Sequence, residues 1–69
     1  MVKVGDCTLV PFGGLWFLTD ADDRLVSTIL DMGEGTWRAR TPEGSARTFE
    51  VPPDVADPPL WVAREITAA

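Results

Sequence analysis

Apolar and polar residues alternate along much of the chain, a pattern typical of β-strands that bury one face. The alternation is clearest in residues 35–51, which also contain a turn signal. Pro42 pre-sets φ for a type I turn, and Gly44 accepts the left-handed conformation that follows. Residues 42–44 therefore predict the three-residue loop of a β-hairpin with a G1 bulge.

This hairpin has a definite predicted register. Counting back from the turn, the pairs are Thr41–Ser45, Arg40–Ala46, Ala39–Arg47, Arg38–Thr48 and Trp37–Phe49. Because side chains alternate between the faces of a strand, Trp37 and Phe49 share one face with Arg47. Arg38 and Arg40 lie on the opposite face, which is polar and basic. A face of this kind is either plain solvent surface or a binding surface.

Strand signals also precede the hairpin. Residues 2–4 predict a short edge strand, and residues 7–10 predict a second strand that Pro11 stops. Residues 15–19 and 24–30 predict an earlier hairpin. The first strand of that hairpin is apolar on both faces, as is usual for a strand in mid-sheet or covered on both sides. We therefore expect the second face of the sheet to be covered either by the N-terminal strands or by a partner.

Turns separate these strands. The earlier hairpin turns at a cluster of acids, Asp20, Asp22 and Asp23, and residues 31–35 predict the next turn. Calcium loops need ligands at regular spacing with a distal bidentate glutamate, and the acidic cluster does not match that spacing. We therefore interpret the cluster as a solvated turn rather than a metal site.

A C-terminal helix is predicted for residues 58–67. Asp57 is a good N-cap, and Pro58 suits the first helical position. The stripe expected to pack on the sheet consists of Val62, Ala63 and Ile66. The residues on roughly the opposite side are Leu60 and Arg64. Trp61 lies between the two sides, where it is either part of the core or at its rim.

The predicted fold class is α+β. We expect a small antiparallel sheet of about four to five strands, joined in successive hairpins, with one C-terminal helix, in a single domain over residues 1–69. The alternative is a small SH3-like barrel, which the Val-Gly-Asp opening and the short, evenly spaced strands favour.

Composition and charge narrow the class of partner. The net charge of −5 disfavours nonspecific binding of the whole molecule to nucleic acid or to anionic membranes. With one cysteine, Cys7, and no histidine, the chain cannot form an intramolecular disulfide or fill a structural zinc site. The absence of a leader pattern and of a long apolar run predicts a cytoplasmic protein without a membrane span.

No catalytic constellation stands out. Cys7 has no histidine to activate its thiol, and most of the eleven acidic residues fall in turns or at exposed strand positions. We therefore predict that the protein is not an enzyme and uses no cofactor. The chain lacks Asn, Gln, Tyr and His, which resembles the codon bias of GC-rich genomes such as those of actinobacteria and their phages.

The predicted function is binding of another protein, such as a host protein, by a small adaptor or inhibitor. Exposed tryptophan and arginine are typical interface anchors. The candidate partner-binding residues are the aromatic anchors Trp16 and Trp61, the basic residues Arg38, Arg40 and Arg47, and the acidic turn with Asp20, Asp22 and Asp23. A homodimer or structural subunit, assembled through an exposed strand edge, is an alternative.

A second alternative comes from a resemblance. The run Gly35-Thr-Trp-Arg-Ala-Arg, followed by Gly44, Phe49 and a helix with Trp61-Val62, resembles the arm-type DNA-binding domains of phage tyrosine recombinases. The resemblance covers residues 35–65 and implies a three-stranded sheet that enters the major groove, with a helix behind it. The chain departs from this pattern in its acidic charge, its single lysine and its extra N-terminal strands. Phosphate contacts by two or three arginines give limited affinity, so nucleic acid is the less favoured partner.

Overall fold

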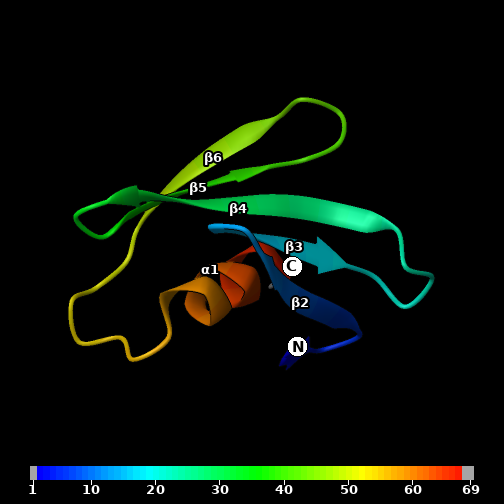
Figure 1. The fold of residues 1–69 in the computed structure, drawn as a ribbon, viewed down its shortest axis with the longest axis horizontal. Coiled ribbons are helices and arrows are strands. Elements are labelled where there is room, and N and C mark those ends of the chain that lie inside the picture. Colours follow the sequence, from blue (N-terminus) through cyan, green and yellow to red (C-terminus); the bar gives the residue numbers. More distant parts are fainter. Residues whose placement is uncertain (1, 68–69) are drawn as a thin grey trace.

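Six β-strands follow one another through a single antiparallel sheet, and one helix comes after them in the described part of the chain (Figure 1). The computed structural model describes residues 2–67. The strands are β1 (Val2–Val4), β2 (Cys7–Phe12), β3 (Leu15–Thr19), β4 (Leu25–Gly33), β5 (Thr36–Arg40) and β6 (Ala46–Glu50). The helix is α1 (Pro58–Thr67), with the bounds that the sequence predicts.

The sheet is an open meander. Each strand pairs with its neighbours in sequence, so β1 lies at one edge and β6 at the other. The predicted α+β architecture of antiparallel hairpins with a C-terminal helix is confirmed. The expected count of four to five strands is too low, because both N-terminal segments join the sheet. The structure does not confirm the alternative of an SH3-like barrel.

The hairpin of β5 and β6 has the predicted register, with Trp37 opposite Phe49. The pairing extends one residue further, to Thr36 opposite Glu50. At its turn, the amide of Thr41 donates to the carbonyl of Ser45 at 2.9 Å, and the amide of Gly44 donates to the carbonyl of Thr41 at 3.0 Å. Gly44 has a φ of 96°, the left-handed conformation expected of the bulge residue. The turn geometry and the register of the two strands therefore agree with each other and with the prediction.

Strand β2 is longer than predicted. It continues through Pro11 to Phe12, so the prediction that Pro11 stops this strand is wrong. Strand β1 pairs with β2 only between Cys7 and Leu9. Pro11 lies beyond that pairing, where its missing N–H is not needed by β1. As a consequence, Phe12 becomes a strand residue that pairs with Leu15.

Strand β4 is also longer than predicted and extends to Gly33, although the sequence predicts a turn over residues 31–35. Its register with β5 shifts between Asp31 and Gly33, which marks a bulge or irregularity. A bulge absorbs an extra residue and lets a strand continue. The turn itself contains only Glu34 and Gly35, which both have positive φ, 55° and 82°.

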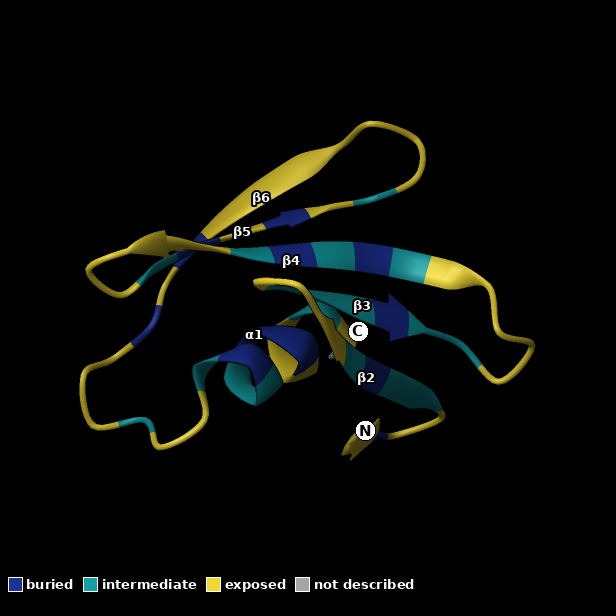
Figure 2. Ribbon diagram, in the orientation of Figure 1, coloured by how far each residue is buried: buried dark blue, intermediate teal, exposed yellow. Residues whose placement is uncertain are grey.

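Helix α1 covers one face of the sheet, which we call the inner face (Figure 2). Val62 and Ala63 are fully buried and Ile66 is half-buried against the core, as the apolar stripe predicts. The Asp57 carboxylate accepts a hydrogen bond from the amide of Leu60 at 3.4 Å, in agreement with its predicted role as N-cap. The buried apolar residues of the core are Val4, Leu9, Leu18, Ile29, Trp37, Ala39, Phe49, Val51, Val62 and Ala63.

Leu60 differs from its expected place on the far side of the helix. It is half-buried and packs against the core, whereas Arg64 is exposed as predicted. The helix contacts both β1 and β4 (Figure 1). The core therefore packs against a wider side of α1 than the apolar stripe alone predicts.

Candidate functional site

The face of the sheet turned away from α1, which we call the outer face, has no described helix or strand over it (Figure 1). Strands β1 and β2 extend the sheet at its edge, so the first of the two expected covers for this face, the N-terminal strands, does not lie over it. Two cross-strand rows of side chains run over this face from β2 to β6. The first row is Phe12, Leu15, Leu30, Arg38 and Thr48, and the second is Val10, Phe17, Thr28, Arg40 and Ala46.

The half of the outer face on β2, β3 and β4 is mostly apolar. The rings of Phe12 and Phe17 contact each other with centroids 5.5 Å apart. Phe12 is 66% exposed, and Phe17, Leu15 and Leu30 are only half-buried. These four side chains lie outside the hydrophobic core cluster. A contiguous patch of this kind differs from scattered surface hydrophobics, because such patches mark interaction surfaces in soluble proteins.

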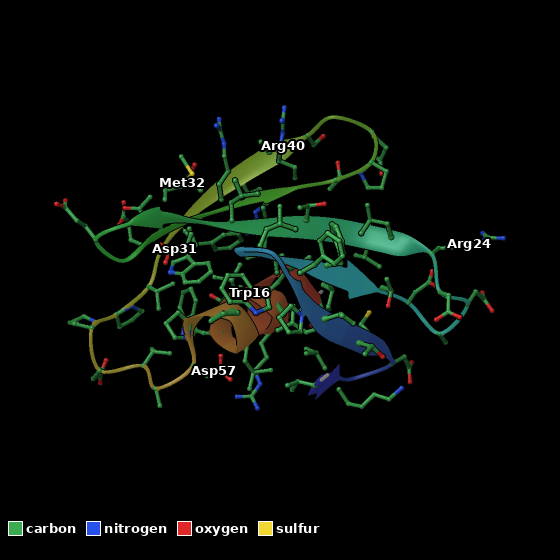
Figure 3. All side chains as sticks on the ribbon, viewed as in Figure 1. Trp16, Arg24, Asp31, Met32, Arg40 and Asp57 are labelled. Atoms are coloured by element: carbon green, nitrogen blue, oxygen red, sulfur yellow. The ribbon has the colours of Figure 1, made fainter. Side chains whose placement is uncertain are left out.

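The half of the outer face on β5 is basic. Arg38 and Arg40 are both exposed, and Figure 3 shows that Arg40 points away from α1, on the same side as Met32. The cross-strand neighbours of Arg38 are Leu30 and Thr48, and those of Arg40 are Thr28 and Ala46, none of them acidic. The two guanidinium groups therefore stand beside the apolar patch without a directly opposed carboxylate.

The two tryptophans expected as anchors lie on the inner face. Trp16 is half-buried and stacks at a tilt against buried Trp37, with ring centroids 5.2 Å apart (Figure 3). Trp61 is half-buried on α1 and meets the ring of Phe49 edge-on at 6.4 Å. Both indoles thus pack against the core, and Trp61 joins the helix to the sheet.

Arg47 is separated from the other two arginines of the hairpin. It pairs with Ala39, a buried residue of the inner face, while Arg38 and Arg40 lie on the outer face. Its guanidinium carbon lies 4.8 Å from the centre of the Phe49 ring, which is the geometry of a cation–π contact. Arg47 therefore packs on the ring of a core residue, Phe49, in the edge strand β6.

The acidic turn is built from hydrogen bonds within itself. The Asp20 carboxylate accepts from the amides of Asp22 and Arg24, both at 2.9 Å. Asp23 takes a positive φ of 62° to close the turn. The same turn projects Arg24 outward at the end of the β3–β4 hairpin (Figure 3). This turn lies beyond the strand pairs that form the two rows of the outer face, so the candidate acids and arginines do not form one site.

Residues 2–67 offer no site of another kind. They contain no group of three or more His, Cys, Asp and Glu placed to hold a metal ion, and no cavity. Cys7 is a free thiol, half-buried against the core. The helix within this range is too short and polar to cross a lipid bilayer. The outer face is thus the candidate contact surface among the described residues.

Sequence reasoning missed Phe12, Leu15, Phe17 and Leu30 as candidate contact residues. One signal was present, because the strand at residues 15–19 is apolar on both faces and so predicts a second covered face. Phe12 was missed because a strand that ends before Pro11 leaves its aromatic ring without a predicted face.

Comparison of the chain with known protein families, curated proteins and solved structures finds no match.

Proposed function

We propose that this protein is a small acidic module that binds another protein, as an adaptor or inhibitor, through the outer face. The observation that carries the proposal is the uncovered apolar patch of Phe12, Leu15, Phe17 and Leu30. Full burial of a large apolar side chain is favourable by about 1.5–3 kcal/mol, so a partner that covers this patch gains substantial free energy. No catalytic role is included in the proposal.

The arrangement of charge supports a protein partner. Arg38 and Arg40 flank the patch on one side, as a polar rim flanks the apolar centre of an interface. Arginine and aromatic residues are also the residue types enriched among binding hot spots. A protein surface that binds duplex DNA instead needs cations spread along both phosphate backbones. The centre of this face is apolar, and the chain carries a net charge of −5.

The proposal is tested by affinity capture with matched variants. The tagged protein captures binding proteins from a nuclease-treated lysate of a GC-rich bacterium, in parallel with Phe12→Ser and with Val2→Ser. Phe12 and Val2 are both exposed apolar strand residues, at 66% and 40%. Val2 lies two residues from buried Val4 and therefore shares the inner face with it. We expect at least one protein that the parent and Val2→Ser capture and Phe12→Ser does not. Equal capture by all three proteins would contradict the proposal.

A further inference from the structure

The two halves of the outer face differ in chemistry along the direction that crosses the strands. The apolar half ends at Leu30 on β4, and the next strand carries Arg38 in the same row. Neighbouring strands lie about 4.8 Å apart, so the arginines begin one strand spacing beyond the apolar patch. A segment that covers both halves is therefore complementary to them when it is apolar on one side and anionic along the adjoining edge.

From this arrangement we infer that the occupant of the outer face is an acidic amphipathic helix of the partner protein. Its apolar stripe lies on Phe17 and Leu30, and its carboxylates face Arg38 and Arg40. The inference rests on the proposed function, to which it adds the chemical class and the secondary structure of the segment that binds.

The spacing of the two arginines fits a helix. Arg38 and Arg40 are two residues apart on one strand, which separates them by about 6.8 Å. Acidic side chains at positions i and i+4 of a helix have Cβ atoms about 5–6 Å apart, which long arginine side chains match easily. A helix with side chains is about 10–12 Å wide, close to the distance across two strand spacings from β3 to β5.

Backbone hydrogen bonding favours a helix over an extended peptide on this face. An extended segment laid flat on Phe12, Leu15 and Leu30 has its N–H and C=O groups against side chains that cannot bond them. A helix pairs these groups internally. An extended segment is better placed at an open sheet edge, where main-chain groups are free, than over this apolar surface.

The charge of the rest of the molecule adds selectivity. The chain has eleven acidic and six basic residues, so a basic helix is attracted to many places on its surface. An acidic helix is repelled over most of that surface, whereas beside the apolar patch it meets two exposed cations on one strand, Arg38 and Arg40. The attraction between the acidic helix and the two arginines therefore sets the orientation of the helix more than it raises the affinity of binding.

The test uses a display library of helix-forming 18-residue peptides with a fixed leucine stripe and variable flanking positions. The library is selected on the parent protein and on the charge reversal Arg38→Glu with Arg40→Glu. The control is Arg24→Glu with Arg64→Glu, which changes the net charge equally at exposed positions outside both rows. Circular dichroism confirms that each variant is folded.

We expect peptides selected on the parent and on the control to carry Asp or Glu beside the leucine stripe. The Arg38→Glu, Arg40→Glu variant should instead select Lys or Arg at the same positions. For one selected peptide, exchanging its flanking acids for lysine should weaken binding by about tenfold, because two exposed ion pairs are lost.

Failure of the inference and failure of the proposed function give different results. Selected peptides that require Phe12 but show no acidic preference would overturn the acidic helix and leave protein binding in place. Peptides whose binding is unaffected by Phe12→Ser would overturn both. A concentration-dependent dimer of the parent that Phe12→Ser abolishes in sedimentation would make a second copy the occupant and overturn the inference. Duplex DNA that displaces the selected peptides would overturn it in favour of nucleic acid.

Discussion

The two faces of this sheet are formed by the same strands, but α1 covers the inner face and no described helix or strand covers the outer face. On the inner face, Trp16 contacts Trp37 between two strands, and Phe49 contacts Trp61 between the sheet and its helix. On the outer face, one aromatic contact of similar distance is left open to solvent. The difference shows that an aromatic cluster does not by itself identify a core, because what covers the cluster decides whether it stabilises the fold or remains free to bind.

Individual strands differ in the same way, in whether their outward residues are polar or apolar. Strand β5 follows the rule for a sheet with one wet face, since Trp37 and Ala39 point inward and Arg38 and Arg40 point outward. Strand β3 does not, since two of its outward residues are the apolar Leu15 and Phe17. A strand that is apolar on both sides lowers the solubility of an uncovered sheet. We interpret the outward apolar residues as a feature of binding rather than of folding.

The largest expected effect comes from breaking the inner face. Trp37→Ala should lower the free energy of unfolding by about 3–5 kcal/mol, because it removes a large buried side chain, 5% exposed, from a small core. Denaturant melts followed by circular dichroism measure the loss. Phe12→Ala is the matched aromatic truncation on the outer face. A loss below about 1 kcal/mol for Trp37→Ala would show that the inner face is not the stabilising one.

A smaller effect on stability is expected at the turn that joins β5 and β6. Gly44→Val should destabilise the fold by about 1–3 kcal/mol, because a β-branched residue resists a φ of 96°. An added Cβ meets no heavy atom within 4 Å, so the penalty is conformational rather than steric. Gly44→Asn, which tolerates positive φ better, is the control and should melt between the two. Equal melting of Gly44→Val and the parent would contradict the turn assignment.

Features set by local chemistry were predictable from the sequence. The register of β5 and β6 follows from Pro42, Gly44 and strict alternation, and the bounds of α1 follow from Asp57, Pro58 and the apolar stripe. Each of these depends on residues close together in the chain. Their mutual consistency, with turn and pattern giving the same answer, is what makes such predictions dependable.

Features set by distant neighbours were not predictable in the same way. The tolerance of Pro11 within β2 depends on where β1 stops pairing, and the continuation of β4 to Gly33 depends on a register shift against β5. The outer face is the clearest case. The sequence shows that β3 has two apolar sides, but which side α1 covers is decided by the packing of Trp16 and Leu18 in the core that the helix completes.

Phe12→Ser tests the outer face, as Trp37→Ala tests the inner face. We expect the free energy of unfolding to change by less than about 1 kcal/mol, because the ring is 66% exposed and packs against Phe17. The solubility of the free protein should rise, and partner capture should fall. Denaturant melts and salt-induced precipitation measure stability and solubility. A loss of stability as large as that of Trp37→Ala would show that the outer face belongs to the core.

The smallest effect on stability is expected from Arg38→Ala combined with Arg40→Ala. Both side chains are exposed and lie on the face opposite Trp37, so the melting curve should coincide with that of the parent. The control is Arg24→Ala with Arg64→Ala, which removes the same charge from exposed positions outside the two rows. The pair of variants separates the local role of the outer-face arginines from the general effect of net charge.

The same two variants decide between a protein and DNA as the partner. If the sheet binds duplex DNA, removal of Arg38 and Arg40 should lower the affinity and flatten its salt dependence by roughly one unit for each phosphate that is no longer neutralised. We expect instead that the parent shows no salt-dependent duplex binding at moderate ionic strength, because a net charge of −5 opposes the approach of a polyanion. Fluorescence anisotropy of a labelled duplex measures this across a salt series. Micromolar, salt-sensitive binding by the parent and the Arg24, Arg64 control, abolished in the Arg38, Arg40 variant, would replace the protein partner with DNA. It would also give weight to the resemblance to recombinase arm-type domains.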